Sequence, residues 1–439
     1  MKLPVIKGFD EEAFNKYVKN TGWLMLGRVL SMIVGFVVAR FLGPLSFGEL
    51  SFADAFTTIA ASIGALGLDS FIIREIINDP SKKNEILGTS LFLRVGVNLL
   101  LIPISIGSYM LFHHLSDKPG ESLAYIVAIL SFAAFFKSFN IIDSYFQSQV
   151  QSKYVVQVQN ICVIVSAVAK IILVVLKLPV IWFAWALVFD AIILAFGLVI
   201  RYQLKGHNIF AWHFKKERAQ TLLKHSAPLI LSAVMVSIYM KIDQVMLKTQ
   251  GSETVGVYSA VAKISEAWYF IPVAIVTSVF PAIVLARKTD HARYIKRLQN
   301  LYDLLVGISL PVAAVITVAS SVIIHIVYDN KFEGAENMLP IHIWSGIFVF
   351  LGIASSQFLL AEGLTKISFY RAAFGAIVNV LLNLWLIPLY GGVGASIATL
   401  VAYACSTFYL LFIPKTRQQG LMMLKSLFLI SIYQKIFKR

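Results

Sequence analysis

Charged residues and cysteines are scarce in this sequence. Only 14% of its 439 residues are Asp, Glu, Lys or Arg, whereas about 25% is usual for a soluble domain. The two cysteines, Cys162 and Cys405, both lie in apolar runs, which argues against a disulfide framework or a thiolate metal site. The eight histidines show no H-x-x-x-H spacing, and P-loop and nucleophile-elbow motifs are absent. These absences argue against a soluble protein and against covalent or metal-dependent catalysis.

Long apolar runs make up most of the chain instead. Hydrophobic residues account for 58% of it and the mean hydropathy is +0.78. A run of about 20 apolar residues matches one helix across the roughly 30 Å hydrocarbon layer. We therefore predict an all-α, polytopic membrane protein with about twelve transmembrane helices. The predicted spans are 21–41, 50–68, 87–111, 122–142, 155–176, 180–200, 227–247, 257–284, 304–327, 339–361, 371–388 and 393–413.

Lysine and arginine are distributed very unevenly among the loops. Alternate loops together with the two terminal segments carry 27 of the 38 basic residues, and the loops on the other side carry four. Cytoplasmic loops are enriched in Lys and Arg, so this split predicts that both termini are cytoplasmic. It also explains the net charge of +15 without a nucleic-acid partner.

A basic segment divides the chain into two halves of six helices. We expect an N-terminal lobe (1–205), a cytoplasmic linker (206–225), a C-terminal lobe (226–414) and a cytoplasmic tail (415–439) with an interfacial helix at 421–433. A weak internal repeat supports the division, because three positions recur at an offset of 208 residues. These pairs are Gly43 with Gly251, Gly48 with Gly256, and Ser51 with Ser259. Because each lobe has an even number of helices, both lobes would have the same orientation in the membrane. They would then be related by an axis along the membrane normal.

Eleven ionisable side chains lie inside the predicted spans. They are Arg28, Arg40, Asp54, Arg94, Lys137, Lys170, Asp190, Lys241, Asp243, Lys263 and Glu266. Each costs on the order of 2.5 to 3.5 kcal/mol at the centre of a membrane helix, so such residues persist where they face protein or a water-filled cavity. The stretch from Lys241 to Glu266 holds four of them, and we expect it to line a path through the membrane.

Several passages resemble the Wzx-type polysaccharide flippases of the multidrug/oligosaccharidyl-lipid/polysaccharide exporter superfamily. They are ARFLGPLSFGELSFADAF, GLDSFIIREI, ILGTSLFLR, DSYFQSQVQSKYV, YSAVAKISEAWYFIP, YIKRLQNLYDLLVGISLP and PLYGGVGASIATLVAY. The resemblance implies two six-helix lobes around a central cavity lined by helices one, two, seven and eight. It implies alternating-access transport of an undecaprenyl-diphosphate-linked oligosaccharide across the bacterial inner membrane. The implied partners are this lipid-linked oligosaccharide, membrane lipid and polysaccharide polymerase machinery.

The diphosphate of such a substrate would be attracted by cations in the cavity. We predict that Arg28, Arg40, Lys241 and Lys263 bind it, and a guanidinium suits it best because its planar fork can hold two phosphate oxygens. Arg28 shares a helical face with Ser31, Met32 and Gly35. A structural alternative for Arg28 is that it reaches the cytoplasmic interface.

Most of the other charges have a structural alternative. Arg40 could pair with Asp54, and Lys263 with Glu266 one helical turn away. Lys137 and Lys170 lie near span ends, where their ammonium groups can reach the interface.

Five further residues complete the candidate set. Arg94 is deep but lies on a helix that is peripheral in the family. Asp190 and Asp243 could partner a cation or act in coupling to protons or sodium. Trp268 and Tyr269 are candidates for stacking on a sugar, although interfacial placement is usual for such residues. No cofactor is expected.

Two other functions are compatible with a polytopic protein of this size. A multidrug exporter of the same superfamily would take organic cations, which favour acids in the cavity, whereas seven basic residues here oppose four acidic ones. An intramembrane polysaccharide polymerase or ligase typically has a large extracytoplasmic loop, and none is present. Transport without covalent chemistry is therefore the favoured interpretation.

Overall fold

The protein is helical throughout the part of the chain that the structure describes, a computed structural model covering residues 11–115 and 123–437. Seventeen α-helices are joined by short turns and 3-10 segments. The α-helices are α1 (Glu11–Gly64), α2 (Asp69–Asn78), α3 (Lys83–Leu115), α4 (Ala124–Lys137), α5 (Ile141–Ser148), α6 (Lys153–Val175), α7 (Val180–Leu204), α8 (Lys216–Met246), α9 (Ser252–Glu266), α10 (Phe270–Thr289), α11 (His291–Val318), α12 (Ser320–Tyr328), α13 (Ala335–His342), α14 (Ser345–Ala361), α15 (Thr365–Phe408), α16 (Arg417–Leu427) and α17 (Ile430–Phe437). The 3-10 segments are η1 (Pro80–Lys82), η2 (Ser138–Asn140), η3 (Ile209–Ala211), η4 (Leu247–Gln250), η5 (Asp329–Lys331) and η6 (Tyr409–Phe412).

Twelve passes through the membrane follow from ten long apolar helical stretches. Two of these stretches are each two spans, because α1 and α15 reverse direction at a glycine. Gly43 in α1 has φ 72° and Gly391 in α15 has φ 53°, a backbone conformation that glycine adopts without strain. A straight helix of 54 residues would be about 80 Å long, far more than one bilayer. The all-α, twelve-span expectation is confirmed.

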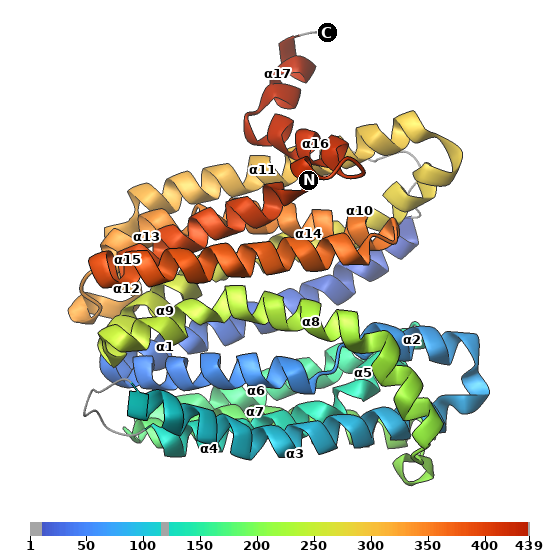
Figure 1. The fold of residues 1–439 in the computed structure, drawn as a ribbon, viewed down its shortest axis with the longest axis horizontal. Helices are drawn as coiled ribbons and strands as arrows, with labels where there is room; N and C mark the ends of the chain where they lie inside the picture. Colours follow the sequence, from blue (N-terminus) through green and yellow to red (C-terminus); the bar gives the residue numbers. More distant parts are fainter. Residues whose placement is uncertain (1–10, 116–122, 438–439) are drawn as a thin grey trace.

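The helices form two groups, seen as the lower and upper parts of Figure 1. The lower part contains α3, α4, α6 and α7, and the upper part contains α11, α13, α14 and α15, while α8 and α9 run between them (Figure 1). Successive spans alternate in direction, so the connections gather at two ends. We call the end that carries residues 79–83, 205–215 and 290 the basic end. The opposite end, which carries Gly43, Gly251 and Asp329, we call the sealed end.

The segment predicted as a linker is half helical. α8 starts at Lys216 and continues without interruption into the seventh span. Arg218 fixes this start to the N-terminal half, since its guanidinium lies 3.0 Å from a Glu75 oxygen and 2.9 Å from a Glu85 oxygen. The backbone amide of Lys215 also donates to Thr89 Oγ1 at 3.1 Å. The connection between the halves is therefore anchored to the first half.

The eighth predicted span breaks between α9 and α10 at residues 267–269, a few residues before Pro272. The apolar segment 421–433 forms parts of the short helices α16 and α17 and contains no candidate membrane span. α17 projects away from the body of the protein (Figure 1).

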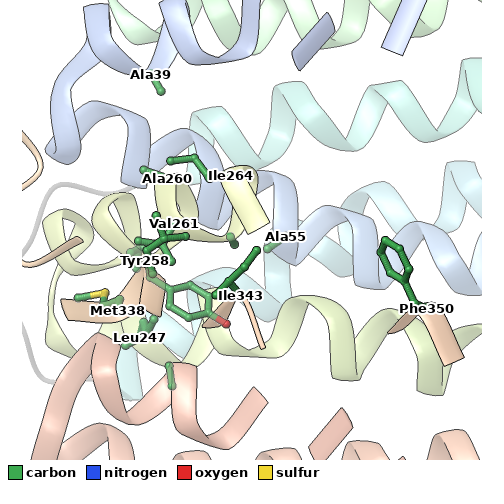
Figure 2. Packing of buried hydrophobic residues seen from close by; sticks show 14 of the residues in the cluster. Ala39, Ala55, Leu247, Tyr258, Ala260, Val261, Ile264, Met338, Ile343 and Phe350 are labelled. Carbon is green, nitrogen blue, oxygen red and sulfur yellow. The ribbon is translucent and has the colours of Figure 1, made fainter. Parts of the chain in front are cut away.

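The core between the halves is built from small and branched side chains near the sealed end. Figure 2 shows Tyr258, Val261 and Ile264 of α9 among residues from α1 and α13, including Ala39 and Met338. All are buried, and Ala39 and Val261 are completely inaccessible. Small side chains let helices approach closely in a membrane, where dispersion contacts take the place of the hydrophobic effect. This packing positions α1 and α9 side by side at the sealed end.

Candidate functional site

A cavity of about 1060 Å³ lies between the two halves. Its described lining comes from α1, α6, α7, α8, α9, α10, α14 and α15, so both halves contribute to its wall. Eight of the described lining residues are Asp, Glu, Lys or Arg, five basic and three acidic. They are Arg28, Asp54, Lys170, Asp190, Lys241, Lys263, Glu266 and Arg371.

Three of the predicted substrate-binding cations face this cavity. They are Arg28 of α1, Lys241 of α8 and Lys263 of α9. Among the residues that the structure describes, no carboxylate oxygen lies within 4.0 Å of any of the three. Cations that line a cavity without a direct ion pair favour the binding of an anion. The wall is therefore suited to a negatively charged ligand.

Gly35 makes room for one of these cations. A Cβ atom at Gly35 would lie 2.4 Å from Lys263 Cε, so any larger residue would displace the lysine. The Lys263 ammonium also lies 5.3 Å from the centroid of the Phe47 ring, within range of a cation–π interaction. Both Gly35 and Phe47 belong to α1, which thus positions a side chain of α9.

The three acids of the cavity differ in their partners. Asp190 forms an ion pair with Lys170 at 2.5 Å, so Lys170 is a cavity residue and does not extend to the interface as we expected. The alternative partners considered for Asp54 and Glu266 are not found, because neither lies within 4.0 Å of Arg40 or Lys263, respectively. Sequence proximity by one helical turn did not bring Lys263 and Glu266 into contact.

Arg40 lies at the sealed end, outside the described lining of the cavity. Its Nη2 is 3.3 Å from an oxygen of Asp329, and its Nη1 donates to the Ile326 carbonyl at 3.2 Å. This ion pair joins α1 to η5, a contact between the halves that the sequence did not reveal. The expected substrate-binding position of Arg40 is therefore not observed.

Two further candidates are part of the protein framework and do not line the cavity. Arg94 is 3% exposed and pairs with Asp69 at 2.9 Å, within the N-terminal half. Trp268 is also absent from the described lining and is 37% exposed. Its neighbour Tyr269 does line the cavity, because the break after α9 turns the two adjacent side chains in different directions.

Asp243 lies behind the cavity wall, where it is 2% exposed and lines no part of the cavity. It accepts hydrogen bonds from Tyr258 Oη at 2.9 Å and Thr399 Oγ1 at 2.7 Å, and also from the Asn383 amide. Asn379 is hydrogen-bonded to Asn383 at 3.2 Å. No described cation lies within 4.0 Å of this carboxylate. We call these five residues of α8, α9 and α15 the Asp243 cluster.

Arg371 and two tyrosines are cavity residues that the sequence did not single out. Arg371, the first residue of the predicted eleventh span, lies within α15, is 9% exposed and faces the cavity. Tyr239 and Tyr403 also line the cavity, with ring centroids 5.2 Å apart. Arg371 could have been found from the sequence by extending the helix of the eleventh span back toward Thr365.

The glycine repeat has a structural counterpart. Gly43 and Gly251 both have positive φ, 72° and 113°, at equivalent turns of the two halves. Gly48 and Gly256 meet each other, since a Cβ at Gly48 would lie 1.7 Å from the Ser252 carbonyl oxygen, and one at Gly256 would lie 1.9 Å from that of Pro44. Two backbones can approach this closely only without side chains. α1 and α9 are thus in direct backbone contact at the sealed end.

The fold is similar to that of known transporters. A structure of the lipid II flippase MurJ in an inward closed conformation aligns with a TM-score of 0.75 at 16% identity, covering 96% of this chain and 93% of that one. An inward-facing multidrug resistance MATE family transporter of the MOP superfamily aligns with a TM-score of 0.68 at 16% identity, covering 91% and 96%. A MOP superfamily transporter from Pyrococcus furiosus, whose structure is described as having a binding pocket of reverse polarity, aligns with a TM-score of 0.62 at 17% identity, covering 92% and 96%.

Sequence comparisons identify one related membrane protein and two matching family models. An uncharacterized membrane protein of Methanocaldococcus jannaschii, MJ1375, is 27% identical over 392 residues, which cover 83% of this chain and 89% of that protein. The MatE family model matches residues 228–385. The family model described as "Polysaccharide biosynthesis protein" matches residues 17–287, more than half of the chain. This multi-pass membrane protein therefore belongs to the polysaccharide biosynthesis protein family, and its fold is similar to that of MOP superfamily transporters.

Proposed function

We propose that this protein is a flippase for an undecaprenyl-diphosphate-linked oligosaccharide repeat unit in the bacterial inner membrane. The observation that carries the proposal is the cavity between the halves, in which Arg28, Lys241 and Lys263 have no described carboxylate within 4.0 Å. A diphosphate is the anion that such a set of cations would attract, and transport requires no covalent chemistry. The flippase would hand its product to polysaccharide polymerase machinery.

The basic end faces the cytoplasm in this proposal, because it carries most of the lysine and arginine of the loops. The diphosphate enters from the inner leaflet and meets Arg28, which lies nearer the basic end of α1, and then Lys241 and Lys263. The glycan crosses through the hydrated cavity while the polyprenyl tail stays in lipid. The halves then separate at the sealed end and close at the basic end.

The contacts between α1 and the C-terminal half at the sealed end are of a kind that can break reversibly. They comprise the Gly48–Gly256 backbone contact and the Arg40–Asp329 ion pair, in which both side chains are about half exposed. Half-exposed ion pairs contribute little stability. Breaking the Arg40–Asp329 ion pair therefore adds little to the free-energy cost of opening at this end.

The Asp243 cluster is the site we propose for ion coupling. A carboxylate that is 2% exposed and has only neutral partners is strongly unfavourable unless it binds a proton or a metal cation. Hydroxyl and amide oxygens surround it, and these are ligands that suit a sodium ion. Asp243→Asn should abolish the dependence of transport on sodium or on the proton gradient. Unchanged ion dependence in that variant would contradict the assignment.

An exporter of organic cations is the competing function, and Asp54 and Glu266 are the observation in its favour. Both acids line the cavity without a described cation within 4.0 Å. A cation exporter would lose drug resistance when both are replaced by Asn and Gln. A flippase of anionic lipids would keep its substrate under the same change.

The decisive experiment is deletion of the protein in its host, followed by analysis of lipid-linked oligosaccharides. We expect a completed unit to accumulate on the cytoplasmic face and surface polysaccharide to disappear. Arg28→Ala should give the same result at normal protein level, whereas Lys177→Ala, an exposed lysine away from the cavity, should complement fully. Normal surface polysaccharide in the Arg28→Ala strain, or changed drug resistance alone, would contradict the flippase function.

A further inference from the structure

Arg371 is a buried cation with no counter-charge. It is 9% exposed, faces the cavity, and has no carboxylate oxygen within 4.0 Å among the residues that the structure describes. Its buried Nε atom has no hydrogen-bond partner there either. A guanidinium remains charged in proteins, and isolating it from water without an anion is strongly unfavourable. This arrangement indicates that Arg371 meets an anion from outside the protein.

The guanidinium is held in place by neutral groups. Its Nη1 donates to Ser355 Oγ at 2.9 Å and its Nη2 to Ser356 Oγ at 2.7 Å, both on α14. Ser406 Oγ in turn donates to the Arg371 carbonyl at 3.1 Å. Serine hydroxyls fix the orientation of the side chain without cancelling its charge. The cation is thus preorganised toward the cavity, which lowers the entropy cost of binding.

Arg371 reaches the cavity from other helices than the cations that we assign to the diphosphate. It belongs to α15 and is held by Ser355 and Ser356 of α14. Lys241 and Lys263 reach the same cavity from α8 and α9.

Two aromatic rings line the cavity together with this cation. Tyr239 interacts electrostatically with Arg371 and packs edge-to-face on Tyr403, and all three residues line the cavity. An aromatic ring beside a fixed guanidinium suits a sugar that carries an acidic substituent, because the ring covers the apolar sugar face while the cation binds the charge.

We propose that Arg371 and Tyr239 form a second subsite, within the C-terminal half, for an anionic group on the glycan. The transported oligosaccharide is then acidic, bearing a carboxylate or a phosphate ester in addition to its diphosphate. This inference rests on the proposed flippase function and adds the chemical class of its cargo.

The first test is mass spectrometry of the lipid-linked oligosaccharide that accumulates when the protein is deleted. The expected glycan carries at least one acidic group beyond the diphosphate, and its mass and sensitivity to phosphatase distinguish carboxylate from phosphate. A neutral glycan would overturn the subsite and leave the flippase function intact. Accumulation of no lipid-linked oligosaccharide would overturn both.

The second test compares transport of that acidic oligosaccharide with transport of the same molecule after its acidic group has been chemically neutralised. Arg371→Gln should slow transport of the acidic form at least tenfold relative to the neutralised form, and Arg371→Lys should restore part of the difference. Lys366→Gln removes the same charge from an exposed position on α15 and should change neither rate. If Arg371→Gln slowed transport of both substrates equally, the role of Arg371 would be purely structural, which would contradict the proposal.

A further variant covers the case in which Arg371→Gln does not fold. Ser355→Ala combined with Ser356→Ala keeps the charge but removes both hydrogen bonds that orient it. We expect this double variant to reduce the discrimination between acidic and neutralised substrate about threefold or more. Full discrimination in the double variant would contradict a preorganised subsite.

Discussion

The same two helices, α1 and α9, behave oppositely at the sealed end and at the cavity. At the sealed end Gly48 and Gly256 bring their backbones into contact, and Arg40 of α1 is neutralised by Asp329. Farther along, the two helices present Arg28 and Lys263 to the cavity without a described carboxylate within 4.0 Å. At the sealed end the described cation of α1 is paired with a carboxylate, whereas at the cavity the described cations of the same two helices have none within 4.0 Å. If the proposed function holds, sealing and substrate attraction are separate functions of one helix pair.

Breaking the seal should have the largest effect. In Gly256→Ala the added methyl would sit 1.9 Å from the Pro44 carbonyl oxygen, so α1 and α9 must move apart. We expect transport to fall at least tenfold and cysteines introduced at the sealed end to become reactive toward a membrane-impermeant thiol reagent.

Gly307→Ala is the matched control, because nothing lies within 4 Å of its added Cβ. It should leave transport unchanged and could raise the free energy of unfolding by up to about 1 kcal/mol through helix propensity. If Gly256→Ala transported as well as Gly307→Ala, backbone contact would not be the seal.

Removing charge from the cavity should have the next largest effect. Lys241→Gln combined with Lys263→Gln eliminates two cations from the wall while keeping side-chain length. Binding of undecaprenyl diphosphate to purified protein should weaken at least tenfold, and the remaining affinity should depend less on salt because fewer charges interact. Cysteines introduced at the sealed end should react with the membrane-impermeant thiol reagent as they do in the native protein. Increased reactivity would mean that the cavity and the sealed end do not act separately.

Displacing one cation should have a smaller effect than removing two. Gly35→Ala places a methyl 2.4 Å from Lys263 Cε, the far part of a flexible side chain, so the lysine can shift while the helices stay in place. We expect a two- to fivefold loss of undecaprenyl diphosphate affinity with no change in thermal stability. A large loss of stability would show that Gly35, like Gly256, is a backbone contact.

The ion pair of the sealed end should give the smallest effect, and only in acid. The backbone amide of Asn330 and the nearby Arg40 lower the pKa of Asp329, so the carboxylate stays ionised to lower pH in the sealed state than in a state where the pair is broken. Its contribution to sealing is complete above the usual carboxyl pKa of about 3.9 and declines as the pH falls through the lowered value. The reactivity of the sealed-end cysteines, expressed relative to a freely exposed cysteine at the same pH because only the thiolate reacts, should be constant from pH 5 to 8. Asp329→Asn should abolish any rise in this ratio seen in acid. A change centred near neutral pH would contradict this assignment.

Some of the site could be predicted because the membrane restricts where charges can be. Arg28, Lys241 and Lys263 interrupt long apolar spans, and each does line the cavity. Sequence reasoning failed where the decisive neighbour is distant in the chain. Arg40 pairs with a residue 289 positions away, and Asp243 is surrounded by Asn383 and Thr399 of another helix. Arg371 was missed because the end of an apolar run does not mark the end of a helix.

The sequence by itself determined the helical class, the number of membrane passes and the basic end, because each span must satisfy its own backbone hydrogen bonds in lipid and loop charges are local properties. Only the tertiary structure decided which buried charges are neutralised and which face the cavity. That outcome depends on side chains brought together from helices far apart in sequence, at distances of a few ångströms where Coulomb energy and desolvation nearly balance.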